Sequence, residues 1–303
     1  MSSIAFYGSI ESGFIYALVA LGVLISFKLL DFPDMTADGS FPLGGAVCAV
    51  CLVKGLDPWL ATLAGAAAGF CAGLVTAFLN VRFKIMNLLA GILVMVALYS
   101  INLRIVGAPN QALINVPQGT VFDPFVNDGN SIWIRAVVLA GIVVAVKIAL
   151  DWLFATEIGM SMRATGANPR MARAQGINTG KMVVIGMGIS NALVALGGSM
   201  YVQSQGGYDI SIGMGTIVIG LAAVIIGEAL FPAKRFFLIS LGVVVGSLLY
   251  RFFIQLALGS DYLQVIGLGP QDLNLITALL VIAALVVPQL KSKLSRKAGR
   301  FAQ

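Results

Sequence analysis

The sequence contains no histidine, the side chain most often used for metal binding and for acid–base catalysis near neutral pH. It contains only three cysteines, Cys48, Cys51 and Cys71. Cys48 and Cys51 form a C-x-x-C pattern inside an apolar stretch, with no second pair of ligands nearby. We therefore interpret them as small buried side chains, and we predict no metal site and no cofactor in this chain.

Motifs of nucleotide chemistry and covalent catalysis are also missing. The chain has no G-x-x-x-x-G-K-[ST] loop to hold phosphates, no G-x-S-x-G nucleophile elbow and no cluster of carboxylates with ligand spacing. We predict that the chain is not an enzyme. Any nucleotide hydrolysis that accompanies its function must take place on another chain.

Charged residues are scarce and apolar residues are abundant. Only 11% of the 303 residues are charged, 59% are hydrophobic, and the mean hydropathy is +0.96. A soluble domain of this length could not cover so much apolar surface, so lipid must be the main solvent. The net charge of +6 does not indicate nucleic-acid binding, because the basic residues are spread between apolar runs and in the tail.

The apolar runs predict an all-α polytopic membrane protein with a single domain, residues 1–303. About 20 mostly apolar residues are needed for a helix to cross the hydrocarbon core. One predicted segment, Phe41–Val53, is shorter than that and follows a polar run. The nine predicted segments are Tyr7–Leu29, Phe41–Val53, Pro58–Asn80, Met86–Val106, Ser131–Phe154, Met182–Gln203, Ile210–Leu230, Phe236–Leu258 and Leu273–Leu290.

The basic residues predict the orientation of these segments. With the basic tail Lys291–Arg300 in the cytoplasm, alternation places the basic stretch Arg163–Lys181 and the basic residues Arg82 and Lys84 on the same side. The opposite loops, Gly107–Asn130 and Gly259–Asp272, contain no lysine or arginine. This asymmetry follows the positive-inside rule, and it places the N-terminus outside with an odd number of spans.

A short sequence that occurs twice in the chain indicates an inverted repeat. The segment Ala17–Gly22 recurs identically as Ala192–Gly197, and the same offset aligns Asp34 with Asp209. The two helices that contain the copies run in opposite directions, as in transporters that build two gates from inverted repeats. The predicted halves are roughly 1–156 and 182–303, joined by a cytoplasmic loop, 157–181. Chance similarity between apolar helices remains the alternative.

The cytoplasmic loop 157–181 carries signals of helix ends. We expect Gly166 to end a short helix by adopting a left-handed backbone, and Asn168 to cap the next helix, with Pro169 at its first position. That second helix would cover Pro169–Gln175 and end at Gly176. The alternative is a plain basic loop that only anchors the topology.

Two segments resemble a known family. Arg163-Ala-Thr-Gly-Ala-Asn-Pro169, followed by Ala172 and Gly176, resembles the coupling loop of ATP-binding-cassette (ABC) importer permeases in the branched-chain-amino-acid and ribose permease superfamily. Asp31-Phe-Pro-Asp-Met-Thr-Ala-Asp-Gly-Ser-Phe-Pro-Leu-Gly-Gly45 resembles a branch of that superfamily in which some members are linked to aromatic amino acids. Ile15–Gly22 is similar to the family's first helix.

This resemblance implies a permease subunit in a bacterial inner membrane, importing a small solute that we expect to be an amino acid. It also implies ATPase subunits that hold ATP and Mg, a separate periplasmic or lipid-anchored substrate-binding protein, and a second permease copy, most simply as a homodimer. Sugar and nucleoside substrates remain open, because fold does not determine the ligand. The residues implied to contact the ATPase are Arg163, Ala164, Thr165, Gly166, Asn168, Pro169, Ala172 and Gly176.

The acidic run before Phe41 indicates a transport pathway, because short interrupted segments in matching repeat positions mark such pathways. The repeat places Asp31–Ser40 near the inner face and Gln205–Gly215 near the outer face as paired gates. We expect Asp38 or Ser40 to cap the half-helix that starts near Phe41. The acids could alternatively be caps and loop charges without a substrate role. The predicted pathway and gate residues are Asp34, Thr36, Asp38, Ser40, Asn191, Tyr201, Gln203 and Asp209.

Two other classes compete with the importer permease. A secondary transporter driven by an ion gradient requires ionisable groups near the bilayer centre, and the sequence indicates no ion pair there. A membrane-embedded enzyme requires a catalytic cluster of polar residues at one membrane face, and none is visible.

The predicted topology can be tested by cysteine labelling in intact cells. Single cysteines at Asn110 and Ser260 should react with a membrane-impermeant reagent, because both positions lie in loops without basic residues. A cysteine at Ser292, in the basic tail, should react only after the membrane is permeabilised. The reverse labelling pattern would refute the orientation.

Overall fold

The computed structural model describes residues 3–114, 116–126, 131–232, 235–258 and 282. Within them, seven stretches are helical, long and apolar enough to cross a membrane, and a shorter apolar helix accompanies them. The predicted segments up to Leu258 all form helices, while Leu273–Leu290 lies outside the described residues. These helices are α1 Ser3–Val23, α3 Pro58–Phe83, α4 Asn87–Val106, α5 Ser131–Ala155, α8 Thr179–Gln205, α9 Thr216–Leu230 and α10 Phe236–Leu258, with α2 Ala37–Val53 as the shorter one.

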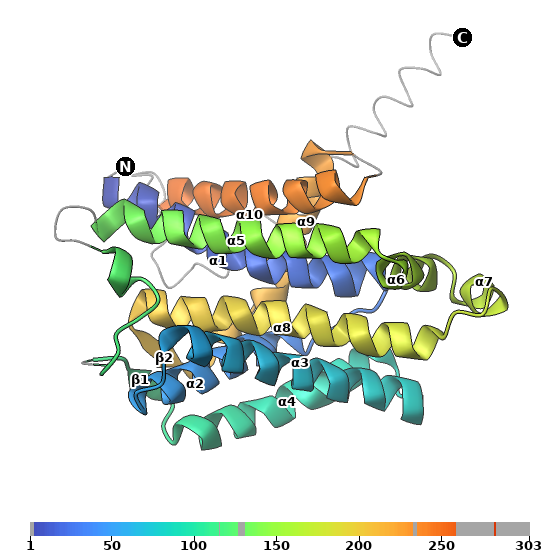
Figure 1. Cartoon of the computed structure of the whole chain (residues 1–303), viewed down its shortest axis with the longest axis horizontal. Helices are drawn as coiled ribbons and strands as arrows, with labels where there is room; N and C mark the ends of the chain where they lie inside the picture. The colour runs from blue at the N-terminus through green and yellow to red at the C-terminus, as the bar shows by residue number, and fades with distance from the viewer. Residues whose placement is uncertain (1–2, 115, 127–130, 233–234, 259–281, 283–303) are drawn as a thin grey trace, which may run out of the picture.

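The bundle has two distinct ends (Figure 1). The short helices α6 (Glu157–Ala167) and α7 (Pro169–Ala174) project at one end, and strands β1 (Asn110–Ala112) and β2 (Gly207–Asp209) pair antiparallel at the other. We call these the α6–α7 end and the β1–β2 end. The strand pair was not predicted; it forms because the chain leaves α4 and α8 at the same end.

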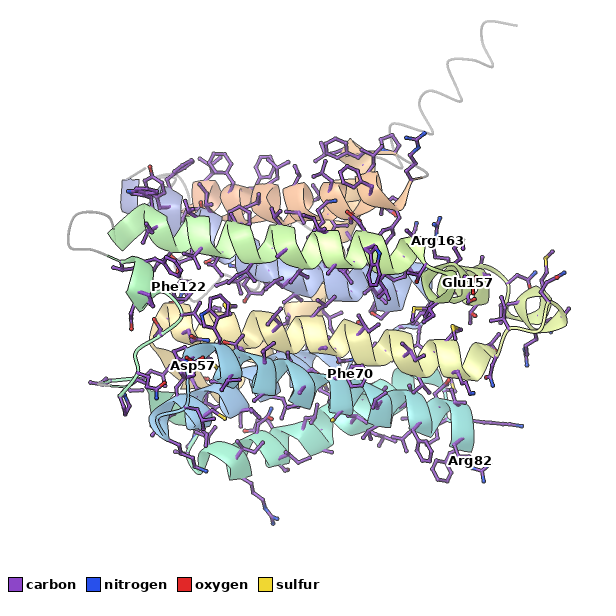
Figure 2. All side chains as sticks on the ribbon, viewed as in Figure 1. Asp57, Phe70, Arg82, Phe122, Glu157 and Arg163 are labelled. Atoms are coloured by element: carbon purple, nitrogen blue, oxygen red, sulfur yellow. The ribbon has the colours of Figure 1, made fainter. Side chains whose placement is uncertain are left out.

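Labelled side chains follow the same division. Figure 2 shows Asp57 and Phe122 at the β1–β2 end, and Arg82, Glu157 and Arg163 at the α6–α7 end. The grouping of Arg82 with Arg163 agrees with the side that the basic residues predict for both. The orientation of the two ends in the cell stays a prediction.

Glycines allow the central helices to approach one another closely. Gly65, Gly69 and Gly73 of α3 face α8, and a Cβ added at any of them would overlap atoms there. A Cβ on Gly44 of α2 would overlap the backbone of α8 as well. These glycines therefore let α2 and α3 pack closely against α8.

Buried serines add hydrogen bonds between helices. Ser190 and Ser199 of α8 donate to carbonyl oxygens of α1 and α2 at 2.7 and 3.0 Å. Ser247 of α10 donates to a carbonyl oxygen of α1 at 2.8 Å. Each bond joins two helices where no water competes, and such bonds average roughly 0.6 kcal/mol in a membrane protein.

Two short helices begin inside the bundle. After α1 and its π-helical continuation η1 (Leu24–Leu29), the chain turns back, and α2 starts at Ala37 beside the middle of α8. From there α2 runs to the β1–β2 end. Helix α9 starts next to the start of α2 and runs the opposite way, so that its Glu228 forms a 2.8 Å ion pair with Lys28 of η1.

This arrangement corrects one expectation. Asp31–Ser40 and Gln205–Gly215 were expected near opposite faces. The chain enters the two segments from opposite ends of the bundle, but the segments meet at mid-depth. There a Cβ on Gly213 would overlap the backbone oxygen of Asp38. They meet because each short helix starts halfway through the bundle rather than at its surface.

Candidate functional site

A buried polar cluster lies where α2 begins. Asp34 is 1% exposed; its Oδ1 accepts from the Thr36 backbone N–H at 2.9 Å, and its Oδ2 accepts from Asn191 Nδ2 at 2.7 Å. Ser40 Oγ donates to Asn191 Oδ1 at 2.7 Å. The hydroxyl oxygens of Thr36 and Thr76 are also 2.7 Å apart. We call Asp34, Thr36, Ser40, Thr76 and Asn191 the polar cluster.

The polar cluster joins three helices to one re-entrant loop. Its members come from the loop before α2 and from α2, α3 and α8. Asp34, a carboxylate in an apolar bundle, would be costly unless hydrogen bonded, and here two neutral donors bond to it. The structure thus brings together four of the predicted pathway residues, Asp34, Thr36, Ser40 and Asn191. All four side chains are buried, so in this conformation they connect the helices to one another and do not line an accessible pathway.

Asp38 has a different partner from the one expected. Its Oδ1 accepts from the backbone N–H of Ile217 at 2.8 Å, in the first turn of α9. Our expectation that Asp38 or Ser40 caps its own helix is wrong, because α2 begins at Ala37 and Thr36 stands at its N-cap without a side-chain bond. The first turn of α2 directs Asp38 toward α9, so that its carboxylate caps a helix 179 residues away.

Gln203 lies in a second polar group near the β1–β2 end. Its Nε2 donates to Thr62 Oγ1 at 2.8 Å and to Cys48 Sγ at 3.3 Å, and its Oε1 accepts from the Val121 N–H at 3.0 Å. The bond between Val121 and Gln203 thereby attaches the loop between α4 and α5 to α8. Cys48 is buried, as we interpreted it from the sequence, whereas Cys51, for which we expected the same, is only half-buried. Cys71 is exposed on the bundle surface.

Tyr201 and Asp209 complete the predicted set, also toward the β1–β2 end. The Tyr201 ring lies 5.7 Å from the Phe41 ring, centroid to centroid. Asp209 Oδ1 accepts from the Ser211 N–H at 2.7 Å, just before the 3-10 turn η3 (Ile210–Gly213). Burial, together with the Asp209 carboxylate, raises the pKa of neighbouring Tyr208 to about 12. Of the eight predicted pathway residues, four therefore belong to the polar cluster, and Asp38, Tyr201, Gln203 and Asp209 make other contacts.

An apolar hollow of about 430 Å³ opens between α2, α4 and η3. Met95, Tyr99 and Met214 contribute to its wall, and Asp38 and Asn102 are among its polar residues. The sequence signal for Asn102 was an asparagine within an apolar span, which is more often a helix–helix hydrogen bond. Tyr99 carried no signal, because an aromatic residue in such a span is common.

The short helices α6 and α7 match the predicted coupling loop closely. Asn168 Oδ1 accepts from the N–H groups of Arg170 and Met171 at 3.1 and 3.0 Å, and Pro169 stands at the first helical position. Gly176 has φ +82°, a left-handed backbone, just past the end of α7. The cap, the proline and the terminal glycine are therefore confirmed.

The expectation for Gly166 is wrong. Helix α6 continues through Gly166 to Ala167, so this glycine neither ends the helix nor has a left-handed backbone. It is needed for a close approach instead, because an added Cβ would overlap the carbonyl oxygen of Leu29 in η1. Gly166 thereby allows α6 to dock against the inner continuation of α1.

The remaining residues of the predicted ATPase contact divide into two groups. Thr165 and Ala172 are buried, and Ala164 is half-buried. Arg163 is exposed, like Asn168 and Pro169. The buried members hold α6 and α7 in place, and the exposed members are available to a partner.

An ion pair that the sequence analysis did not name lies within α5, away from the centre of the helix. Lys147 Nζ bonds to Asp151 one turn further along, and Ser240 Oγ of α10 donates to Asp151 Oδ1 at 2.7 Å. Lys147 also lies over the Phe237 ring, 3.6 Å from its centroid. The pair is near the α6–α7 end of α5 rather than at the centre, and its bonds to α10 give it a structural role.

Long apolar helices, two half-helices that meet at mid-depth and a protruding helix pair define a multi-pass membrane transport subunit. The chain belongs to the family described as the branched-chain amino acid transport system permease component, whose model matches residues 6–287. It is therefore the permease subunit of an ABC importer in the cytoplasmic membrane, with no catalytic activity of its own. Membership in this family implies a partner ATPase and a substrate-binding protein.

Individual relatives agree with this assignment. The chain is 41% identical to a tyrosine transport system permease protein of Clostridioides difficile over 93% of this chain and 90% of the relative. It is 28% identical to a nucleoside ABC transporter permease of Lactococcus lactis over 67% of this chain and 64% of the relative. A solved structure of PsaBC from Streptococcus pneumoniae in complex with Fab has a TM-score of 0.51, 15% identity and coverage of 94% and 91%, which supports the fold alone.

Replacing Asp34 should test the polar cluster. Asp34→Leu leaves the Thr36 N–H without a partner and removes one of the two bonds that Asn191 Nδ2 donates, while the bond to the Met187 carbonyl oxygen stays. The loss should be about 1–3 kcal/mol, seen as a lower midpoint of thermal unfolding in detergent. Asp34→Asn keeps an oxygen for Thr36 and should lose less. Asp31→Asn, at an exposed acid of the same loop, should leave the midpoint unchanged. Equal midpoints for Asp34→Leu and the parent would contradict the role of the polar cluster.

Proposed function

We propose that this permease imports an amino acid with an aromatic side chain, of the tyrosine class. The observation that carries the proposal is the 41% identity to a tyrosine transport permease over 93% of the chain. The Asp-rich segment Asp31–Gly45 supports it, because it resembles a branch with aromatic amino acid links. The hollow beside Asp38 has an apolar wall and a volume of about 430 Å³, which is suited to a small solute with an apolar body.

A nucleoside is the second candidate. Its support is the lower identity, 28% over a shorter part of the chain, to a nucleoside permease. Nucleoside recognition needs several hydrogen-bonding groups for the sugar and base. The hollow offers mostly apolar surface, which favours the amino acid.

We also propose that the working unit is a homodimer with the pathway between the two copies. The outward face of α4 supports this idea, because Leu93, Val96 and Tyr99 are exposed there, next to the hollow. The ATPase would bind the exposed side of α6 and α7, with ATP and Mg held on that partner. The substrate-binding protein, periplasmic or lipid-anchored, would bind the β1–β2 end.

The two half-helices support the proposed inverted repeat of 1–156 and 182–303. Asp34 bonds to the N–H two residues ahead, just before α2, and Asp209 does the same just before η3 and α9. The short helices that follow run in opposite directions. We assign the gates of the pathway to these two re-entrant segments, the polar cluster and Asp38 included, with Tyr201 and Gln203 supporting the outer side.

A mechanical route connects the ATPase surface to these gates. Helix α6 docks on η1 at Gly166, and η1 leads directly into the loop that carries Asp34. The polar cluster ties that loop to α8, and Asp38 ties α2 to α9. A shift of α6 on ATP binding would therefore move the start of α2 and, through Asp38, the start of α9.

The substrate proposal is tested by uptake. The permease, its ATPase and its binding protein, purified and reconstituted in liposomes, should take up labelled L-tyrosine only when ATP is supplied on the ATPase side. Competition by unlabelled L-phenylalanine should exceed competition by unlabelled uridine, because the hollow has few polar groups. ATP-driven uptake of uridine without uptake of any amino acid would refute the proposal.

Gly166→Val tests the coupling route in the same liposomes. The valine side chain cannot fit against the Leu29 carbonyl, so α6 should be displaced from η1, and ATP-driven uptake should fall to the level without ATP. Membrane insertion should stay normal. Ala167→Val is the matched control, because Ala167 is exposed on the same helix, and it should keep uptake near the parental rate. Parental uptake per ATP hydrolysed in Gly166→Val would refute the route.

A further inference from the structure

The hollow beside Asp38 contains an unsatisfied polar atom. Asn102 is 0% exposed and lines the hollow; its Nδ2 donates to the Gly39 carbonyl oxygen at 3.3 Å. Its Oδ1 is buried and has no hydrogen-bond partner among the described residues. A buried acceptor without a donor is unfavourable and needs an explanation, and a donor group on a bound molecule would provide one.

Asp38 offers further acceptor capacity in the same hollow. The carboxylate accepts from the Ile217 N–H and also interacts with the backbone N–H groups of Gly215 and Thr216, but it has about four lone-pair positions, so these bonds do not exhaust it. Asp38 is half-buried and lies on the wall of the hollow. The hollow therefore presents a negative charge and a neutral acceptor together, which is the requirement of a cationic donor such as an ammonium group.

The rest of the hollow suits the other parts of an amino acid. Met95, Tyr99 and Met214 give it an apolar wall, and the latter two are 53% and 71% exposed, so the wall can receive a ring. Gly39 in the first turn of α2 and Gly215 at the N-cap of α9 also line it. The N-terminal turn of α2 carries partial positive charge, which favours a carboxylate nearby, whereas that of α9 is already capped by Asp38.

We propose that this hollow is the site at which the permease itself holds the imported amino acid at membrane depth. The substrate's ammonium group donates to the Asp38 carboxylate and to Asn102 Oδ1, and its side chain packs on Tyr99 and the two methionines. The inference rests on the proposed import of an aromatic amino acid. Because Asp38 also caps α9, its carboxylate would bind the substrate and the first turn of α9 at the same time.

The site is tested by protection of a reporter cysteine in the assembled transporter. Ser100→Cys places a thiol on the exposed side of the hollow, in a chain whose accessible Cys51 and Cys71 are replaced by alanine. L-tyrosine should slow its alkylation by a maleimide. Desaminotyrosine, which has the same ring and carboxylate without the ammonium group, should not. Equal protection by both compounds would overturn the proposal.

Asp38→Asn is the decisive variant. The asparagine oxygen can still accept from the Ile217 N–H, so this bond to α9 is kept while the negative charge is removed. The tyrosine concentration for half-maximal protection should rise about tenfold or more, as expected when a charge-assisted hydrogen bond is lost. The matched control Asp31→Asn removes a charge outside the hollow and should leave this concentration unchanged. An unchanged concentration in Asp38→Asn would refute the site.

Failure of the site and failure of the proposed substrate have different signatures. Tyrosine uptake by the parent transporter without any protection of the reporter would overturn the site and leave the proposed function intact. No tyrosine uptake, with protection by another amino acid that depends on Asp38, would overturn the proposed substrate and support the site. No protection by any amino acid would overturn the site in either case.

Discussion

Backbone groups at the middle of a membrane need hydrogen-bond partners within the protein, and this constraint governs the centre of the structure. Both α2 and α9 begin there, and the first N–H groups of any helix lack partners within it. Two acidic side chains provide acceptors. Asp34 accepts at the turn that precedes α2, and Asp38 accepts at the start of α9. The re-entrant chain, the close contact of the two half-helices and the adjoining hollow all depend on these bonds.

The sequence was sufficient for features that depend on local chemistry. Apolar length alone located the spanning helices up to Leu258. Asn168, Pro169 and Gly176 each act on the backbone within a few residues of themselves, so the two ends of α7 were predictable. The clustering of Asp34 with Asn191 was foreseen only in part: both were named as pathway residues, but nothing in the sequence indicated that they bond to each other.

Features that depend on distant neighbours could not be predicted. Gly166 looked like a helix terminator, but its role is set by the Leu29 carbonyl that packs on it. Asp38 looked like a local cap, but its partner Ile217 comes from the other half of the chain. The ion pair of Lys147 and Asp151 was overlooked because the apolar length of α5 outweighed two charges one turn apart. In each case the deciding atom belongs to tertiary structure.

The Asp38–Ile217 bond also bears on how the protein is made. The ribosome synthesises α2 long before α9. The Asp38 carboxylate is therefore already in the bilayer when α9 arrives with its Ile217 N–H still unpaired. The second half of the chain therefore depends on the first for a bond that it cannot supply itself.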